Sequence, residues 1–328
     1  MTETHNGALK LELQGLLDAG CEALRFPNLF EAGALALFHA LRSLLTLDNV
    51  PSSVRLSDLD LGSMAVISNP GSDIFRTQWR GTVVAIKRFR ESNSNPRRAG
   101  RFLYAGAIWR MLDHPNVLPF YGIHIQDMGS RKSIALVTLW ADNSDVLNYM
   151  RIRPDCDRRS LVKQTASGLA YLHRHGIVHG DVRGSNILID GQGRPMLGDY
   201  GQASALTSDP EALIEGLSTS EISSTIRWLA PELTHTRFPE LPADVFSFGR
   251  TILELMTGEK PFNEHRNVWQ IASMLNQGRL SPKRPADPRV VQRGLTDEVW
   301  ELMGEMWENA PAERPEMDVV EERLEQLM

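Results

Sequence analysis

Cysteine is scarce in this chain of 328 residues, where Cys21 and Cys156 are the only two. Two cysteines give no disulfide framework, so we expect a reducing, cytoplasmic location. The first six residues are polar and lack the basic and then apolar order of a signal peptide. The most apolar stretch, residues 32–47, contains His39 and Arg42 and is too short to cross a bilayer. The sequence therefore predicts no membrane span.

An excess of positive charge is also absent, since 35 Lys and Arg residues stand against 41 Asp and Glu residues, a net charge of −6. A general nucleic-acid binder usually carries a strongly basic balance, so we expect no nucleic-acid partner. The 42% of hydrophobic residues and 23% of charged residues are ordinary for a globular protein. The length suits one large domain or two unequal ones.

Apolar residues at helical spacing occur throughout residues 8–48, and Pro27-Asn28 divides them into two runs. We therefore predict an N-terminal helical extension over residues 1–50. Two interpretations remain open. The helices either pack on the domain that follows or form a separate module that binds a partner.

Four later segments have the pattern of regular elements. The apolar runs Val84–Lys87 and Ile134–Val137 are typical of buried strands. Apolar residues at helical spacing predict an amphipathic helix from Leu161 to Leu172, and the remainder of the chain is mostly helical, ending in a helix over residues 317–327.

The most informative polar motif is residues 179–186, His-Gly-Asp-Val-Arg-Gly-Ser-Asn. With Asp199 it places a carboxylate, a carboxamide and a second carboxylate at offsets 0, +5 and +18 from Asp181. Phosphoryl transfer needs a carboxylate that takes or orients a hydroxyl proton, and hard oxygen ligands for the Mg²⁺ of ATP. The motif resembles the catalytic loop and the metal-binding loop of protein kinases.

Further motifs occur in the order that the same family has. Val84–Lys87 resembles the strand whose Lys pairs with the ATP phosphates, and Ala230-Pro231-Glu232 resembles the end of the activation segment. Asp244–Gly249 resembles the buried helix start that supports the catalytic loop, and Arg314 stands where kinases keep the Arg that pairs with that Glu. The positions of the tryptophans, with Asp113–Leu118, look like those of the tyrosine-kinase-like group.

The resemblance covers residues 54–328 and implies an α+β, two-lobed protein kinase fold. It implies a small lobe over about 54–139, made of an antiparallel sheet and one helix, and a large, mostly helical lobe over about 142–328. It also implies ATP and Mg²⁺ as cofactors and a protein substrate or signalling partner.

The resemblance assigns a role to each matching residue. Asp181 would accept or orient the proton of the substrate hydroxyl, and Arg183 would stabilise the transferring phosphoryl group. Thr225 falls where kinases directed to Ser and Thr keep a hydroxyl that bonds to the catalytic Asp. Asn186 and Asp199 would hold Mg²⁺. The expected ATP-binding residues are Lys87, Ile67, Ile74, Ala85, Thr138, Leu139, Trp140, Ala141, Asn186 and Leu188.

The glycine-rich loop departs from the family pattern. Alignment on Trp79 puts Ile67, Asn69 and Ser72 at the three glycine positions, and Pro70 removes an N–H donor. This loop either still covers phosphate or is an ordinary turn between two strands.

Three single positions also depart from the family. Ala105 stands where the family has the helix Glu that pairs with the strand Lys, and no Asp or Glu occurs from Ser92 to Leu112. Gly180 replaces the usual Arg, and Tyr200 replaces the usual Phe. Two functions therefore stay open: an active Ser/Thr protein kinase, or a pseudokinase that binds nucleotide or partners without transferring phosphate.

Overall fold

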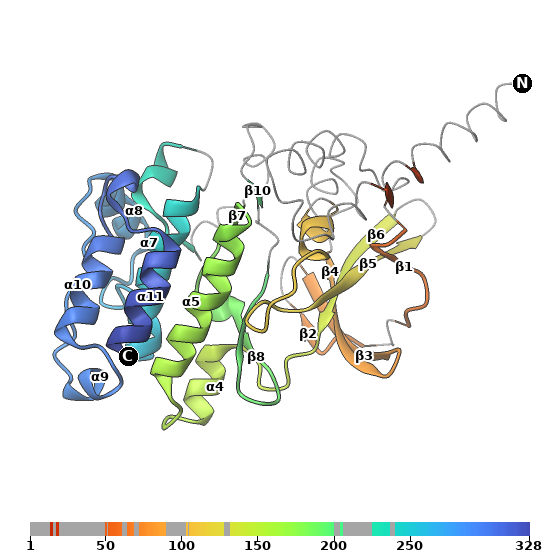
Figure 1. Ribbon diagram of the computed structural model, residues 1–328, viewed down its shortest axis with the longest axis horizontal. Coiled ribbons are helices and arrows are strands. Elements are labelled where there is room, and N and C mark those ends of the chain that lie inside the picture. Colours follow the sequence, from red (N-terminus) through yellow and green to blue (C-terminus); the bar gives the residue numbers. More distant parts are fainter. Residues whose placement is uncertain are drawn as a thin grey trace, which may run out of the picture. The chain divides into compact units, whose positions relative to one another are not determined.

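The computed structural model describes residues 14, 15, 18, 19, 50, 52–60, 64–68, 72–89, 103, 105–127, 132–199, 204, 205, 225–236 and 240–328. The expected extension over residues 1–50 lies almost wholly outside them, and so do Asn69, Pro70 and Tyr200. The chain divides into two compact units (Figure 1). Unit 1 comprises residues 1–113 and 118–140, and unit 2 comprises residues 114–117 and 141–328.

Unit 1 contains a six-stranded sheet with the strand order β1-β5-β6-β4-β3-β2. The pair β1·β5 is parallel and the other four pairs are antiparallel. Both predicted strands are present, inside β4 and β6. The strand bounds are β1 Arg55–Leu56, β2 Ile67–Ser68, β3 Ser72–Trp79, β4 Thr82–Phe89, β5 Phe120–Asp127 and β6 Lys132–Leu139.

A tight hairpin joins β3 to β4. Arg80 and Gly81 occupy the turn with φ of +49° and +81°, the combination that a two-residue turn needs to match the twist of the strands. One face of the sheet is apolar and buried, so alternate residues of β3, β4 and β6 form a core there. That core cluster is Phe75, Val84, Ile86, Ala135 and Val137.

Unit 1 also contains helical residues at 103 and 105–109. Trp109 stacks on Phe120 with ring centroids 4.9 Å apart and donates its indole N–H to Leu118 O at 2.7 Å. Ala105 is buried, with 4% of its surface exposed. The position where the family has a glutamate is therefore packed into unit 1 as a small apolar residue.

Unit 2 is mostly helical, and together with the sheet of unit 1 it confirms the predicted α+β class. The predicted helices over 161–172 and 317–327 lie within α5 and α11. The helices are α4 Val146–Ile152, α5 Arg158–Arg174, α7 Leu241–Thr257, α8 Val268–Asn276, α9 Pro288–Gln292, α10 Asp297–Met306 and α11 Met317–Leu327, with 3₁₀ turns η2 Gly184–Asn186, η5 Pro231–Thr234 and η6 Pro311–Glu313. Short strands pair as β7 Ile177–Val178 with β10 Ser204–Ala205, and as β8 Ile187–Ile189 with β9 Pro195–Leu197.

Local signals explain where these helices begin. Asp145 and Asp157 cap α4 and α5 by accepting backbone N–H groups of the first turn, and Thr296 caps α10 in the same way. Helix α7 ends at Gly258, whose φ of +80° suits the left-handed C-terminal cap. In the part of the chain that the structure describes, no helix has both the length and the apolarity to cross a membrane.

Candidate active site

The predicted catalytic loop is a closed hydrogen-bonded unit between β7 and β8. Asn186 Nδ2 donates to both the backbone O and the carboxylate Oδ2 of Asp181, each at 2.8 Å. The other carboxylate oxygen, Oδ1, lies 3.1 Å from Nε of Arg183. The structure thus brings three of the predicted site residues together, and the Asp181 carboxylate has a fixed orientation.

His179 joins this loop to the start of the predicted metal loop. Its ring is fully buried; Nδ1 accepts from the N–H of Asp181 at 3.2 Å, and Nε2 lies 2.9 Å from Gly198 O. Because Nδ1 is the acceptor, Nε2 carries the proton and donates to that carbonyl. Gly198 N in turn donates to Asn186 O at 2.9 Å. His179 therefore packs beneath the start of the predicted metal loop.

Asp199 follows Gly198 directly and takes a φ of +61°. Aspartate tolerates this left-handed conformation better than most residues. Gly180, at the other end of the catalytic loop, has a φ of +79°. A residue with a side chain would be strained there, so the glycine that replaces the family's Arg suits the backbone.

Helix α7 holds the catalytic loop at successive points along its length. Asp244, with 2% of its surface exposed, accepts from His179 N at 2.6 Å and from Gly180 N at 2.8 Å. The hydroxyl of Thr251 lies 3.1 Å from Val182 O, one to two helical turns further along. The predicted support of the loop by the start of this helix is therefore confirmed, and it extends over most of the helix.

Glu254 is a third α7 contact, and sequence reasoning missed it. Its Oε2 accepts from Gly184 N at 2.9 Å and from the indole N–H of Trp228 at 3.2 Å. Only 1% of this residue is exposed. Burial raises its pKa to about 7, although these two hydrogen bonds and the charges of Arg183 and Lys260 lower it. The signal was an acidic residue inside the apolar stretch of residues 252–256.

Burial also raises the pKa of Asp181. The charge of Arg183 and the hydrogen bond from Asn186 act against this rise, whereas the charge of Asp199 adds to it. A carboxylate with a raised pKa is a stronger base than free aspartate, so it takes a proton from a hydroxyl more readily.

Thr225 lies on the same small cavity as Asp181. The cavity has a volume of about 20 Å³, and Gly180, Asp244 and Trp228 also line it. The guanidinium carbon of Arg183 lies 6.0 Å from the centre of the Trp228 ring. The structure thus places all the predicted catalytic residues of unit 2 around one point.

The two predicted magnesium ligands fit the ion chemically. Mg²⁺ commonly takes one or two protein ligands and completes its octahedron with phosphate oxygens and water. Asn186 directs Nδ2 at Asp181, so its Oδ1 is the atom able to coordinate a cation. Among the described residues there is no group of three or more His, Cys, Asp or Glu side chains that could hold a metal without such help.

Five of the predicted ATP-binding residues of unit 1 share one face of its sheet. Ile67 pairs with Ile74, which pairs with Lys87 across β3 and β4, and Ala85 pairs with Thr138 across β4 and β6. Directly paired residues point to the same face, and this face is opposite the core cluster. Lys87 Nζ lies 5.6 Å from the ring centre of Phe89.

The remaining predicted residues lie at the end of β6, just after it or in β8. Leu139 ends β6, where it pairs with Val84 on the core face, and its N–H donates to Pro119 O at 3.0 Å; Trp140 N donates to Val83 O at 3.1 Å. Ala141 O accepts from the N–H of Ser144 at 3.2 Å in unit 2. Leu188 belongs to β8, where it is half-buried between the buried Ile187 and Ile189.

A buried ion pair closes the segment that follows Thr225. Both terminal nitrogens of Arg314 reach the Glu232 carboxylate at 2.7 Å, and Arg314 also donates to Pro242 O and Glu308 O. The Arg314 side chain is fully buried and 19% of the Glu232 side chain is exposed. The pair predicted from the sequence is confirmed.

Comparison with known proteins agrees with this geometry. A model of the family "protein tyrosine and serine/threonine kinase" matches residues 62–324. Serine/threonine-protein kinase STY17 of Arabidopsis thaliana is 26% identical over 100% of this chain and 55% of its own length. Serine/threonine-protein kinase A-Raf of Mus musculus is 28% identical over 68% of this chain and 37% of its own length. A probable serine/threonine-protein kinase of Dictyostelium discoideum is 25% identical over 77% of this chain and 15% of its own length. The match therefore spans 15% to 55% of these relatives.

Proposed function

Because the chain belongs to the protein tyrosine and serine/threonine kinase family, we propose that it transfers the γ-phosphoryl group of Mg-ATP to serine or threonine hydroxyls of proteins. The observation that carries this proposal is the hydrogen-bonded pair of Asp181 and Asn186, with both contacts at 2.8 Å. This pair joins a proton acceptor to a cation ligand in one rigid loop.

The proposed reaction divides its work among these side chains. The substrate oxygen attacks the γ-phosphorus, Asp181 takes or orients its proton, and the bond to the ADP oxygen breaks. Arg183, beside Asp181, offsets negative charge on the transferring group. Asn186 and Asp199 would hold Mg²⁺, which neutralises charge on the phosphate oxygens. Lys87 would contact the other phosphates.

Specificity for Ser and Thr is supported by Thr225, which shares its cavity with Asp181. The three relatives described above are also named as serine/threonine kinases. We further propose that residues 54–328 form the kinase domain, that residues 1–50 are a separate helical extension, and that the protein acts in the cytoplasm on another protein.

The test is transfer of labelled phosphate from ATP with Mg²⁺ to a panel of protein substrates. Asp181→Asn keeps the shape and the hydrogen bond from Asn186 but removes the base, so we expect the loss of transfer. Asp318→Asn, an equal change at a half-exposed carboxylate of α11, is the control and should keep full activity. Equal transfer from wild type and Asp181→Asn would reject the proposed role of Asp181. Absence of transfer from the wild type would reject the proposed kinase activity.

A pseudokinase is the second candidate, and Ala105 is the observation that favours it. This buried residue stands where the family has the glutamate partner of Lys87. Loss of a charge-assisted hydrogen bond costs about 1.5–3 kcal/mol, which corresponds to roughly ten- to a hundredfold in rate. If the kinase is active but handicapped, Ala105→Glu should raise transfer by about that factor. Unchanged transfer from a folded Ala105→Glu variant would mean that the missing glutamate is not the limiting defect.

A further inference from the structure

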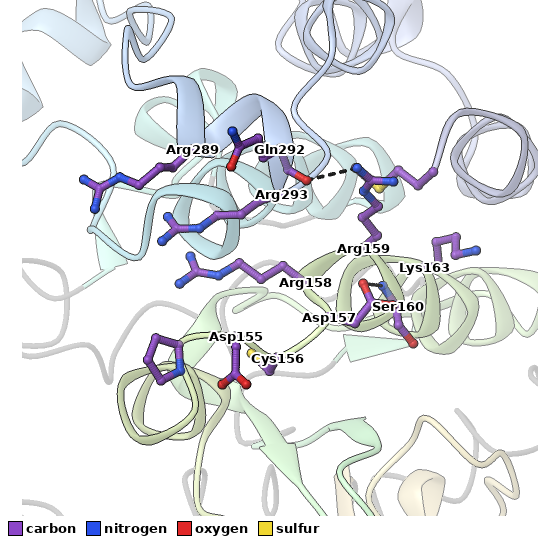
Figure 2. A pocket seen from close by; sticks show the side chains of 12 residues that line it. Asp155, Cys156, Asp157, Arg158, Arg159, Ser160, Lys163, Arg289, Gln292 and Arg293 are labelled. Atoms are coloured by element: carbon purple, nitrogen blue, oxygen red, sulfur yellow. Dashed lines mark hydrogen bonds between the residues drawn. The ribbon is translucent and has the colours of Figure 1, made fainter.

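Unit 2 contains a second pocket that the proposed phosphoryl transfer does not use. It has a volume of about 650 Å³ and is lined by the segment 154–157 before α5, by the first turns of α5, and by residues 289–293 in and after α9 (Figure 2). Pockets that bind small molecules commonly fall in this size range.

The lining is rich in positive charge. Arg158, Arg159, Lys163, Arg289 and Arg293 all contribute to it. Arg289 pairs with a carboxylate outside the pocket, at 2.8 Å, and Lys163 does so at 3.2 Å. Across the described ranges, no carboxylate lies within ion-pair distance of the other three. These three guanidinium groups therefore make no close ion pair with a described residue, although Arg293 still interacts electrostatically with Asp287.

Two of these guanidinium groups are fixed by the C-terminal end of α7. Arg158 donates from Nη1 to Leu255 O at 2.7 Å and to Met256 O at 3.1 Å, and Arg293 donates to Met256 O at 3.0 Å. The C-terminal end of a helix favours cations. These contacts therefore satisfy one nitrogen of each guanidinium group. Only 6% of Arg158 is exposed, and its Nε has no hydrogen-bond partner among the described residues. Burial and the charge of Arg293 lower the pKa of Arg158.

The third guanidinium is held by a backbone carbonyl next to a glycine. Arg159 donates to Gln292 O at 3.0 Å, and its side chain lies across Gly294, where a Cβ would be 2.8 Å from Arg159 Cγ. Gly294 also has a φ of +121°, so it suits this close approach. In Figure 2 the guanidinium groups of Arg158, Arg289 and Arg293 extend in the same direction, above Asp155. Arg158, Arg159 and Arg293 are thus each held by a backbone carbonyl.

We propose that this pocket binds a small polyol that carries more than one phosphate group. Guanidinium groups with unused donors recognise phosphate oxygens. Asp155 and Ser160 in the lining can bind hydroxyl groups. A nucleotide fits less well because no lining residue is aromatic and could stack on a base. A fatty chain would find little apolar surface.

The test is calorimetric titration of the full chain with myo-inositol trisphosphate at low and at physiological salt. Arg293→Gln and Arg289→Gln should each weaken binding by at least about tenfold, since each removes a charge-assisted contact. The matched control is Arg174→Gln, at the opposite end of α5, where the arginine pairs with Asp318 and Glu321. The Arg289 side chain is 74% exposed and pairs with Asp287, so its variant should fold and is informative even if Arg293→Gln unfolds.

Further titrations separate the possible sources of the phosphate. Vesicles of phosphatidylcholine with a phosphoinositide, bound with the same loss in both variants, would support the site and identify a lipid headgroup as its source. If inorganic tripolyphosphate binds as tightly as the trisphosphate, the proposal that the ligand is a polyol is wrong. Binding of a phosphoserine peptide alone, binding unchanged in both variants, or no binding of any probe would overturn the proposal.

Discussion

Replacement of Glu254 by Gln should remove a specific part of the pH dependence of stability. The folded protein raises the pKa of this carboxyl from 4.5 to about 7. The native state therefore binds the proton more tightly than the unfolded chain does. Such a group favours folding most below about pH 4.5, and this stability is lost as the pH rises through about 7.

The magnitude follows from the size of the shift. One pKa unit corresponds to about 1.4 kcal/mol, so the whole shift is worth roughly 3 kcal/mol, of which about 2.5 kcal/mol falls between pH 5 and pH 8. In Glu254→Gln the amide has no charge to bury, so this loss is absent. The amide can still accept from Gly184 and Trp228, whereas its own N–H₂ adds a cost that does not depend on pH.

The assay is urea unfolding of wild type and Glu254→Gln at pH 5, 6, 7 and 8. The quantity of interest is the difference between their free energies of unfolding, because the constant cost of the amide cancels from its pH dependence. We expect this difference to shift by about 2.5 kcal/mol in favour of the variant as the pH rises. Glu301→Gln, an exposed residue of α10, is the control and should track the wild type. A difference that stays constant with pH would show that Glu254 is ionised normally and refute the reasoning.

Two further substitutions test contacts around the same helix. Gly184→Ala should lower the stability by about 1–3 kcal/mol through overpacking, because its Cβ would lie 2.9 Å from Oε2 of Glu254. The control is Gly304→Ala, which has open space around it and should be neutral or stabilising in thermal unfolding. Equal effects of the two substitutions would contradict this account. Arg314→Ala should cost about 3–5 kcal/mol in urea unfolding, because it leaves the largely buried Glu232 carboxylate unpaired; a loss below about 1 kcal/mol would place this pair with ordinary surface pairs.

Much of the fold could be predicted because its signals are local. The helix α5 follows from apolar residues at helical spacing, and β4 and β6 follow from short apolar runs. The pair of Glu232 and Arg314, 82 residues apart, came from the family resemblance alone. The spacing of hydrophobic residues indicates whether a segment is a helix or a strand. Which distant side chains come into contact can be predicted only from a known fold.

The contacts that were missed depend on the final packing. Glu254 stands out as an acidic residue inside the apolar stretch of residues 252–256, but nothing local indicates that its carboxylate accepts a backbone N–H 70 residues away. The basic pocket could not be predicted for the same reason. Its arginines come from two segments more than 120 residues apart, and beside Asp155 and Asp157 the first segment looks electrically mixed. The net charge of a site depends on which segments the fold brings together.

The attachment of the catalytic loop to α7 also sets how that loop opens. The amide protons of His179, Gly180 and Gly184 are each donated to a carboxylate oxygen carried by this helix. The helix is buried along nearly its whole length. The bonds from His179 and Gly184 are buried, so water reaches these two protons when α7 separates from the loop, and their exchange with deuterium reports global unfolding and not local fraying. Although the catalytic loop is a short irregular connection between β7 and β8, these two amide protons are therefore protected from exchange like those of the core.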